Sequence, residues 1–370
     1  MLHPAFTSAA TPGGADGGAP AAPQRRGRLA GWQIPVKDGT DVAGLPTTHG
    51  NPARTTHPTE TDPFVEALLR AGATVPAKTL TSELGATCYA ERPGVPVLES
   101  PAYPGCTPGG SSTGAAVVVA DGTCRAAHGT DAGGSVRVPA AACEVVGLKL
   151  AGRQLPAHGF LTRGVKDLFT LTGWPAGGRA RRPVRIGVLT RGVFADPPVQ
   201  DRRGAIVETL AALLPYDVVE LAPYRESRET YAHFSVAIKA GFRNVDPLDS
   251  DYIGWLVEES HRLAPGALEA AAEHKRALPG LLAAQWGVDA VLSPTLAFDP
   301  PPLGYFPSLS PAESFEAQTQ WSPWCSLFNV LGTPAIALGG VHLGSLTLTG
   351  PELLRVARDV EALLPGVAAG

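Results

Sequence analysis

Two stretches, Gly109-Gly110-Ser111-Ser112 and Gly129-Thr130-Asp131-Ala132-Gly133-Gly134-Ser135, decide how this chain is interpreted. Both contain Gly-Gly-Ser. Glycine allows the backbone to approach a ligand closely and to adopt positive φ. Consecutive backbone N–H groups in such a loop can converge on one point and stabilise an oxyanion. A serine at the end of the loop is placed to attack a carbonyl carbon, so the two stretches predict acyl-transfer chemistry.

The residues between and after the two clusters predict regular structure around them. Residues 112–120 are almost wholly apolar and predict a short buried helix that ends at Gly122. Residues 124–128 predict a strand, residues 129–135 a tight loop, and residues 145–150 another strand. Because Gly-Ser turns often only reverse the chain, one cluster alone would carry little weight. Two clusters joined by a buried helix and a strand favour a site.

A competing motif overlaps the first cluster. Gly110-Ser111-Ser112-Thr113-Gly114 matches GxSxG, the nucleophile elbow that follows a strand in α/β-hydrolases. Pro101, Pro104 and Pro108 precede it here, and proline is excluded from buried strands. A phosphate-binding loop also fails, because no lysine follows Gly114. The sequence therefore disfavours Ser112 as the nucleophile.

Working outward, strands and helices alternate along the rest of the chain. A helix is predicted at 63–72, with Asp62 as N-cap, Pro63 in its first turn and Gly72 at its end. Alternation of this kind predicts an α/β fold with a mostly parallel or mixed sheet. The other predicted strands are 32–38, 73–77, 184–189, 217–221, 289–292, 335–338 and 345–349, and the other predicted helices are 203–214, 267–285 and 351–364.

Bulk composition restricts the class of protein further. The chain has 370 residues, 44% hydrophobic, and a net charge of -4, so nothing in it predicts binding to nucleic acid or to an anionic membrane. No apolar run approaches the ~20 residues that span a bilayer. Five cysteines without CxxC spacing predict reduced thiols rather than disulfides or a zinc site, and hence a cytoplasmic protein. The length allows one large domain or two.

Residues 1–30 differ from the rest of the chain. They are rich in Ala, Gly and Pro, and three arginines gather at their end, at positions 25, 26 and 28. Without a continuous hydrophobic segment they do not form a secretory signal. We expect a low-complexity, disordered tail, with a transit peptide as the weaker alternative.

The Gly-Ser region and its surroundings resemble the amidase signature family. The likeness runs from Pro108 through Ser135 to Lys149, and Ile34-Pro35-Val36-Lys37-Asp38 is similar to that family's lysine segment. Weaker likeness continues at 289–295 and 328–335, so it covers nearly everything after residue 30. The resemblance implies the amidase signature fold, an α/β fold with a central mixed β-sheet covered by helices on both faces. It also implies a single catalytic domain at residues 31–370.

The same resemblance assigns a Ser-cisSer-Lys triad. Its nucleophile falls on Ser135, its bridging serine on Ser111, after a cis peptide bond, and its base on Lys37. A lysine acts as a base only when neutral, and burial or a nearby cation lowers its pKa. Ser111 then relays the proton between the other two. The implied oxyanion hole consists of the backbone N–H groups of Ala132, Gly133, Gly134 and Ser135.

Neighbouring residues are expected to support these groups. Thr130 and Asp131 would hold the nucleophile loop, and Ser112 would support the site. Arg137 is expected to pack beneath the loop, with pairing to a substrate carboxylate as the alternative. Structural roles are also expected for Lys78, His128 and Cys143.

The resemblance implies hydrolysis of a non-peptide carboxamide to a carboxylate plus ammonia or an amine, through an acyl-enzyme on Ser135. The implied reaction requires neither a metal nor a cofactor, and the implied binding partner is a small-molecule amide substrate. The sequence leaves open whether the protein forms a homodimer. Two alternatives remain: the glutamine-hydrolysing component of a tRNA-dependent amidotransferase, and a non-catalytic descendant of the fold. The chain is shortened relative to the family near 150–159 and 338–344, which leaves the substrate open.

Overall fold

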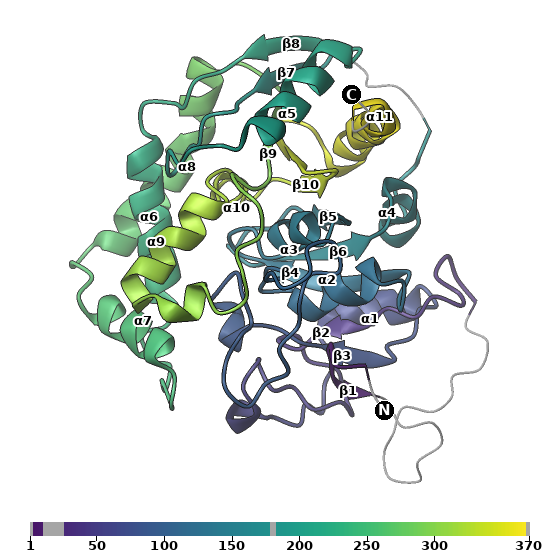
Figure 1. Ribbon diagram of the computed structural model, residues 1–370, viewed down its shortest axis with the longest axis vertical. Helices are drawn as coiled ribbons and strands as arrows, with labels where there is room; N and C mark the ends of the chain where they lie inside the picture. Colours follow the sequence, from purple (N-terminus) through teal and green to yellow (C-terminus); the bar gives the residue numbers. More distant parts are fainter. Residues whose placement is uncertain (1–2, 10–25, 178–182, 368–370) are drawn as a thin grey trace.

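The computed structural model describes residues 3–9, 26–177 and 183–367. One 11-stranded sheet runs through both halves of the chain, in the order β1-β3-β2-β4-β6-β5-β10-β11-β9-β7-β8 (Figure 1). The strands are β1 (Phe6–Ala9), β2 (Val36–Lys37), β3 (Ala77–Thr79), β4 (Ala126–Asp131), β5 (Val146–Lys149), β6 (Ala157–Thr162), β7 (Arg185–Val188), β8 (Asp217–Glu220), β9 (Ala290–Pro294), β10 (Ala335–Leu338) and β11 (Val341–Ser345).

The sheet is mixed, as predicted. β2 pairs in parallel with β3 and β4, and β7 pairs in parallel with β8 and β9. The strands between these two groups are antiparallel, including β4 with β6 and β10 with β11. Val36 of β2 lies opposite both Lys78 of β3 and His128 of β4. This register places Lys37 beside the end of β4, where the second glycine-rich segment begins.

Helices cover both faces of the sheet. One face packs against α4, α5 and α11, and the other against α2, α3, α8 and α10, while α6, α7 and α9 lie together at one side (Figure 1). The helices are α1 (Pro63–Arg70), α2 (Thr113–Ala120), α3 (Arg137–Ala142), α4 (Val165–Thr172), α5 (Asp201–Leu213), α6 (Ser227–Ala240), α7 (Asp251–His261), α8 (Ala267–Gln285), α9 (Pro311–Trp321), α10 (Leu327–Val330) and α11 (Gly350–Val367), with short 3-10 turns at Pro52–Arg54, Glu83–Gly85 and Phe306–Ser308.

Hydrophobic cores lie on both faces of the sheet, because successive side chains along each strand point to opposite faces. In β9, Ala290 and Leu292 face the core beneath α5 and α11, whereas Val291 faces the core beneath α8. In β4, Ala126 and Ala127 divide between the two faces in the same way. Successive side chains of a strand point to opposite faces, so a strand that is apolar throughout requires cover on both. The predicted fold is therefore confirmed.

Local sequence signals predicted the positions of several helices and strands correctly. The Asp62 carboxylate accepts hydrogen bonds from the backbone N–H groups of Phe64 (2.8 Å) and Val65 (3.4 Å), and Pro63 occupies the first turn of α1. α2 is buried along seven of its eight residues, which explains its apolar character on all sides. The predicted helix at 267–285 and strand at 335–338 match α8 and β10.

The expected disordered tail is wrong for residues 3–9. β1 pairs antiparallel with β3, Ala5 is fully buried, and the Ala5 carbonyl accepts a hydrogen bond from the backbone of Leu80 at 2.8 Å. Leu29 is also fully buried, so the end of the expected tail belongs to the fold. A four-residue strand beside low-complexity sequence has too weak a pattern to be recognised alone. Residues 10–25 lie outside the described residues.

Other expected boundaries also require correction. The strand expected at 73–77 is β3 at Ala77–Thr79, and the loop expected from residue 129 starts only after Asp131, because 129–131 complete β4. The strand expected at 345–349 is instead β11, which forms a hairpin with β10. Gly339 and Gly340 connect this hairpin with φ of 53° and 81°. Positive φ at both central positions is typical of a two-residue hairpin turn, and glycine adopts it without strain.

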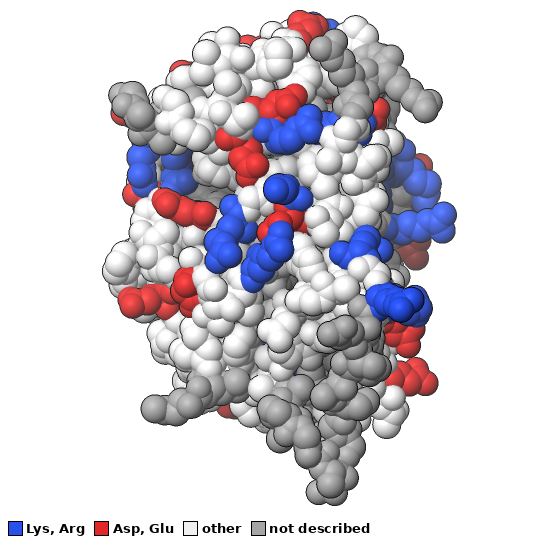
Figure 2. Space-filling view, turned by 90° about the vertical axis from the view of Figure 1, so that its right-hand side faces the viewer, with Lys and Arg blue, Asp and Glu red and all other residues white. Residues whose placement is uncertain are grey.

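The surface of the molecule carries charges of both signs. On the face drawn in Figure 2, basic and acidic side chains are interspersed with uncharged residues rather than gathered into one field of a single sign. Among the helices of the described residues, none combines the length and the apolar character that crossing a membrane requires.

Candidate active site

Lys37 and Ser111 meet in the interior, although they are 74 positions apart in the sequence. The Lys37 ammonium nitrogen Nζ lies 2.6 Å from Ser111 Oγ and also donates to the Thr130 carbonyl at 3.1 Å. Lys37 is 2% exposed and Ser111 1% exposed. The Gly110–Ser111 peptide bond is cis, as the resemblance implies. The structure therefore brings together two of the three residues that the sequence singled out.

The surroundings of Lys37 favour its neutral form. Burial lowers the pKa of Lys37 to about 7, and the nearby Asp131 carboxylate opposes part of this shift. A lysine with an ordinary pKa would be almost wholly protonated at neutral pH and unable to accept a proton. Here a substantial neutral fraction exists near pH 7, which is the condition for a general base.

Ser135 lies at the start of the turn that leads into α3 and lines a pocket. Its backbone carbonyl accepts a hydrogen bond from Ser112 N–H at 3.0 Å, which ties the two glycine-rich segments together. Among the described residues, its hydroxyl has no hydrogen-bond partner, and none joins it to Ser111. Catalytic hydrogen bonds often shorten only when substrate binds, so a free hydroxyl facing a pocket fits a nucleophile.

The loop before Ser135 is fixed by the Asp131 carboxylate. Its two oxygens accept hydrogen bonds from the backbone N–H groups of Gly134 (2.8 Å) and Val136 (3.0 Å). Arg137 completes the arrangement with two further bonds to the same carboxylate, at 3.0 and 2.8 Å. Although burial raises the pKa of Asp131, the Arg137 guanidinium outweighs it and holds that pKa below its ordinary value. The carboxylate thus stays charged and keeps the loop in place.

Arg137 is fully engaged by the protein itself. Besides Asp131, its guanidinium donates to the Cys325 carbonyl (2.8 Å) and to Asn329 Oδ1 (2.6 Å), and lies 2.9 Å from His342 Nε2. The side chain is fully buried. The alternative in which Arg137 binds a substrate carboxylate is therefore excluded, and packing beneath the loop remains. Sequence reasoning missed Asn329 and His342, because their link to Arg137 spans 192 and 205 positions.

The expected oxyanion hole requires one correction. The Gly134 N–H is donated to Asp131, so it is not available to an oxyanion. The backbone N–H groups of Ala132, Gly133 and Ser135 have no acceptor among the described residues and border the pocket. Gly134 is needed for another reason: its φ is 131°, and a Cβ there would lie 3.0 Å from Val138 Cγ2.

The other predicted support residues act mainly through the backbone of Thr130. The Thr130 carbonyl accepts hydrogen bonds from both Lys37 Nζ and Ser112 Oγ, the latter at 3.3 Å. Ser112 therefore links the helix α2 to the strand that carries Thr130. This geometry gives Ser112 a supporting position rather than a place in the pocket.

Two further buried lysines lie near the site. Lys78 donates to Thr47 Oγ1 at 2.8 Å and pairs with Asp38 at 3.4 Å. Lys149 donates to the Thr333 carbonyl at 2.7 Å, and its pKa is lowered to about 7, first by burial and then by Arg137. In neither case does a hydrogen bond connect the ammonium to Ser111. Lys149 was missed, although its place inside the apolar strand predicted at 145–150 is the signal that could have marked it as buried.

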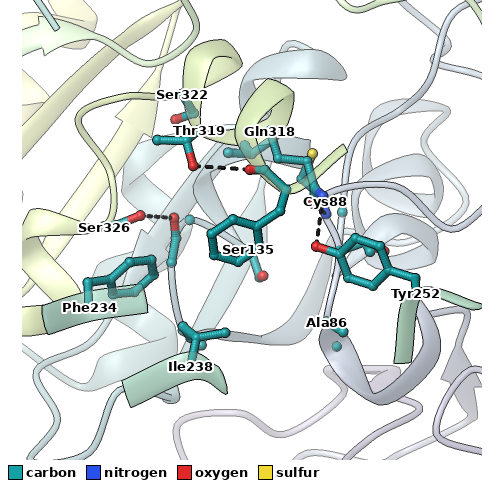
Figure 3. A pocket seen from close by; sticks show the side chains of 18 residues that line it. Ala86, Cys88, Ser135, Phe234, Ile238, Tyr252, Gln318, Thr319, Ser322 and Ser326 are labelled. Carbon is teal, nitrogen blue, oxygen red and sulfur yellow. Dashed lines mark hydrogen bonds between the residues drawn. The ribbon is translucent and has the colours of Figure 1, made fainter. Parts of the chain in front are cut away.

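The pocket beside Ser135 has a volume of about 100 Å³. Figure 3 shows Ser135 near its centre, facing side chains from α6, α7 and α9. Its lining residues are Gly85, Ala86, Thr87, Cys88, Gly110, Ala132, Gly133, Gly134, Ser135, Val138, Phe234, Ile238, Tyr252, Phe315, Gln318, Thr319, Ser322 and Ser326.

One group of potential metal donors lies elsewhere in the described residues. Glu229 and His233 of α6 and His274 of α8 bring their donor atoms within 4.8 Å of one another. None of these three residues lines the pocket that contains Ser135. The group therefore lies apart from the pocket beside Lys37 and the serines. All five cysteines are free thiols.

Comparison with known proteins identifies the family to which the chain belongs. The Amidase family profile matches residues 15–194. AmiA2 of Mycobacterium bovis, a putative amidase by name, is 31% identical in an alignment of 389 positions that covers 90% of this chain and 80% of that protein. The solved structure of 6-aminohexanoate cyclic dimer hydrolase matches with a TM-score of 0.81 at 25% identity, covering 93% of this chain and 87% of that one. One component of the glutamyl-tRNA(Gln) amidotransferase of Haloarcula marismortui is 42% identical over 138 residues, 37% of this chain and 31% of that protein.

The fold and these likenesses define a hydrolase that acts on amide C–N bonds. More particularly, the chain belongs to the amidase signature family.

The Asp131–Arg137 pair leads to a prediction about stability. We expect Arg137→Met to lower the free energy of unfolding by about 3–5 kcal/mol, because it leaves the buried Asp131 carboxylate without its cation. Denaturant unfolding measures this. The control is Arg191→Met, which breaks an exposed pair with Asp196 and should leave the free energy of unfolding nearly unchanged. Equal losses in the two variants would contradict the role given to Arg137.

Proposed function

We propose that this protein hydrolyses a carboxamide to a carboxylate and ammonia or an amine through an acyl-enzyme on Ser135. The observation that carries the proposal is the buried 2.6 Å contact between Lys37 Nζ and Ser111 Oγ, beside the pocket lined by Ser135. We further propose that residues 31–370 act as one catalytic domain, since a single sheet runs through them.

The reaction follows from these positions. Neutral Lys37 accepts the Ser111 proton, and Ser111 accepts the proton of Ser135 as Ser135 Oγ attacks the amide carbon. The free N–H groups of Ala132, Gly133 and Ser135 stabilise the oxyanion. The proton returns along the same path to the leaving nitrogen as the C–N bond breaks. Water then attacks the acyl-enzyme and gives a proton to the same base. The bond between the acyl carbon and Ser135 Oγ breaks, this proton returns through Ser111 to Ser135 Oγ, and the acid leaves and ionises to the carboxylate.

A screen across a library of amides tests the proposal. Hydrolysis should release one ammonia or amine for each carboxylate formed. A fluorophosphonate probe should label the purified protein once, with the added mass on the peptide that contains Ser135. A protein that neither turns over any amide nor takes up the probe would instead support a non-catalytic descendant of the fold.

The pKa of Lys37 predicts the pH dependence. Since the base must be neutral, kcat/KM should rise about tenfold per pH unit below about pH 7 and level off above it. Burial also lowers the pKa of Lys149 to about 7, so Lys149→Met is the control. This variant should keep the same rise of kcat/KM with pH below about pH 7. A profile that is flat between about pH 5 and 8 would rule out Lys37 as the titrating base.

A second function is favoured by one observation, the 42% identity over 138 residues to a component of a glutamyl-tRNA(Gln) amidotransferase. Such a component would release ammonia from glutamine within a larger complex. The matched segment is local, and the longer match is to a protein named as an amidase. Co-purification with a partner chain, together with ammonia release from glutamine, would support this second function over the first.

A further inference from the structure

The pocket beside Ser135 is built from uncharged residues. None of the 18 described residues that line it is Asp, Glu, Lys, Arg or His. On one side lie Phe234 and Ile238 of α6, and opposite them lies Tyr252 of α7 (Figure 3). Burying a charge without a partner costs far more than burying an uncharged group. A charged acyl group would meet no compensating charge in this pocket.

The polar lining residues are largely engaged with the protein itself. Gln318 Oε1 accepts the Cys88 N–H at 2.7 Å, and Gln318 Nε2 donates to the Tyr252 hydroxyl at 3.1 Å. Ser326 Oγ donates to the Gly133 carbonyl at 2.9 Å, and Ser322 Oγ to the Thr295 carbonyl at 2.8 Å. These bonds leave few polar atoms to solvate a charge, so carbon atoms form most of the surface that a substrate would meet.

The small volume of the pocket favours a small acyl group. The pocket volume is about 100 Å³, whereas a protein cavity that binds benzene has ~150 Å³. The Phe234 ring closes one wall, because its Cζ lies 3.0 Å from where a Cβ on Gly133 would be. Charged groups such as Glu91 and Arg92 line a neighbouring cavity that shares Tyr252 with this pocket.

From these features we propose that the pocket binds the acyl part of the substrate and that the substrate is a small, neutral, aliphatic carboxamide. This inference rests on the proposed function and specifies its substrate class. Glutamine serves as the contrast: its ammonium and carboxylate lie within about 5 Å of the amide carbon, given bonds of ~1.5 Å. Both charges would therefore fall inside the uncharged pocket.

Three amides of similar length test the proposal with the wild-type protein. Butyramide has a neutral chain, succinamate carries a carboxylate on a similar chain, and glutamine carries an ammonium and a carboxylate. We expect kcat/KM for butyramide to exceed the other two by at least about 100-fold, since specificity follows from the cost of uncompensated charge. Benzamide, whose phenyl ring is bulkier than the propyl chain of butyramide, should fall at least about tenfold below butyramide.

A pair of variants tests whether the lining itself sets this preference. Ile238→Lys introduces a cation and should raise the ratio of succinamate to butyramide turnover at least about tenfold, while Ile238→Met should leave the ratio within about twofold. An unchanged ratio in Ile238→Lys, with a folded and active protein, would count against the assignment of this pocket.

The outcomes separate this inference from the function it depends on. Turnover of glutamine or succinamate at a rate within about tenfold of butyramide overturns the inference and leaves amide hydrolysis at Ser135 intact. Labelling of Ser135 by a fluorophosphonate without turnover of any small neutral amide also overturns it. Absence of both labelling and turnover removes the proposed function, and the inference with it.

Discussion

Ser135→Ala is expected to lower kcat for amide hydrolysis by about 10⁴–10⁶-fold and to abolish labelling by a fluorophosphonate. The covalent path requires the Ser135 oxygen, and without it only substrate binding and the backbone N–H groups beside the pocket can contribute. Those groups retain a residual acceleration in serine hydrolases, so activity should become small rather than vanish. The measurement is single-turnover ammonia release together with intact-protein mass after exposure to the probe.

Ser112→Ala is the matched control for this experiment. Ser112 lies next to the bridging serine, and its hydroxyl makes one hydrogen bond, at 3.3 Å to the Thr130 carbonyl. Loss of such a bond costs about 1 kcal/mol, so activity should fall by no more than about tenfold. The opposite pattern, an inactive Ser112→Ala and an active Ser135→Ala, would restore the nucleophile-elbow interpretation of Gly110-Ser111-Ser112-Thr113-Gly114.

Local sequence signals predicted those elements whose boundaries depend on nearby residues. α1 begins at a capping aspartate and a proline, and α8 and β10 match their predicted ranges. Boundaries failed where pairing with a distant strand decides them. β1 exists because it adds to β3, which lies far along the chain, and β4 extends through Asp131 because β6 pairs with it there. The residue pattern of one short segment does not reveal which distant strand will pair with it.

The features of the candidate site likewise fall into those that the sequence predicted and those that it could not. The two glycine-rich segments indicated acyl transfer from their residue types alone, and the structure shows the Ser112–Ser135 backbone bond that joins them. Lys37 could be selected only through the family resemblance, because its contact with Ser111 spans 74 positions. Asp131 was expected to hold the nucleophile loop, but that its carboxylate binds the Gly134 N–H, one of the four N–H groups expected in the oxyanion hole, could not be foreseen. It depends on where one carboxylate lies, and residue types do not specify that position.

The second large effect is expected for Lys37→Met. Loss of a general base lowers kcat by about 10²–10⁴-fold. Stability should behave differently, because burial of the ammonium opposes folding: the pKa of Lys37 is about 7 in the folded protein and near its ordinary value of 10.5 when unfolded. Below about pH 7 both states hold the proton and the folded state bears the full cost of desolvation. Relative to the wild type, Lys37→Met should therefore gain stability as the pH falls from about 10 to 7.

Two further variants identify what the lysine contributes. Lys37→Arg keeps a cation and its hydrogen-bond donors, but a guanidinium does not lose its proton, so it should be as inactive as Lys37→Met. Lys78→Met removes another buried lysine from the adjacent strand and leaves the buried Asp38 carboxylate without its cation. That variant should lose about 3–5 kcal/mol of stability. The protein that remains folded should nevertheless show the same rise of kcat/KM with pH below about pH 7. Activity in Lys37→Arg within about tenfold of the wild type would show that a positive charge suffices at this position. A proton relay through Ser111 to a neutral base would then be excluded.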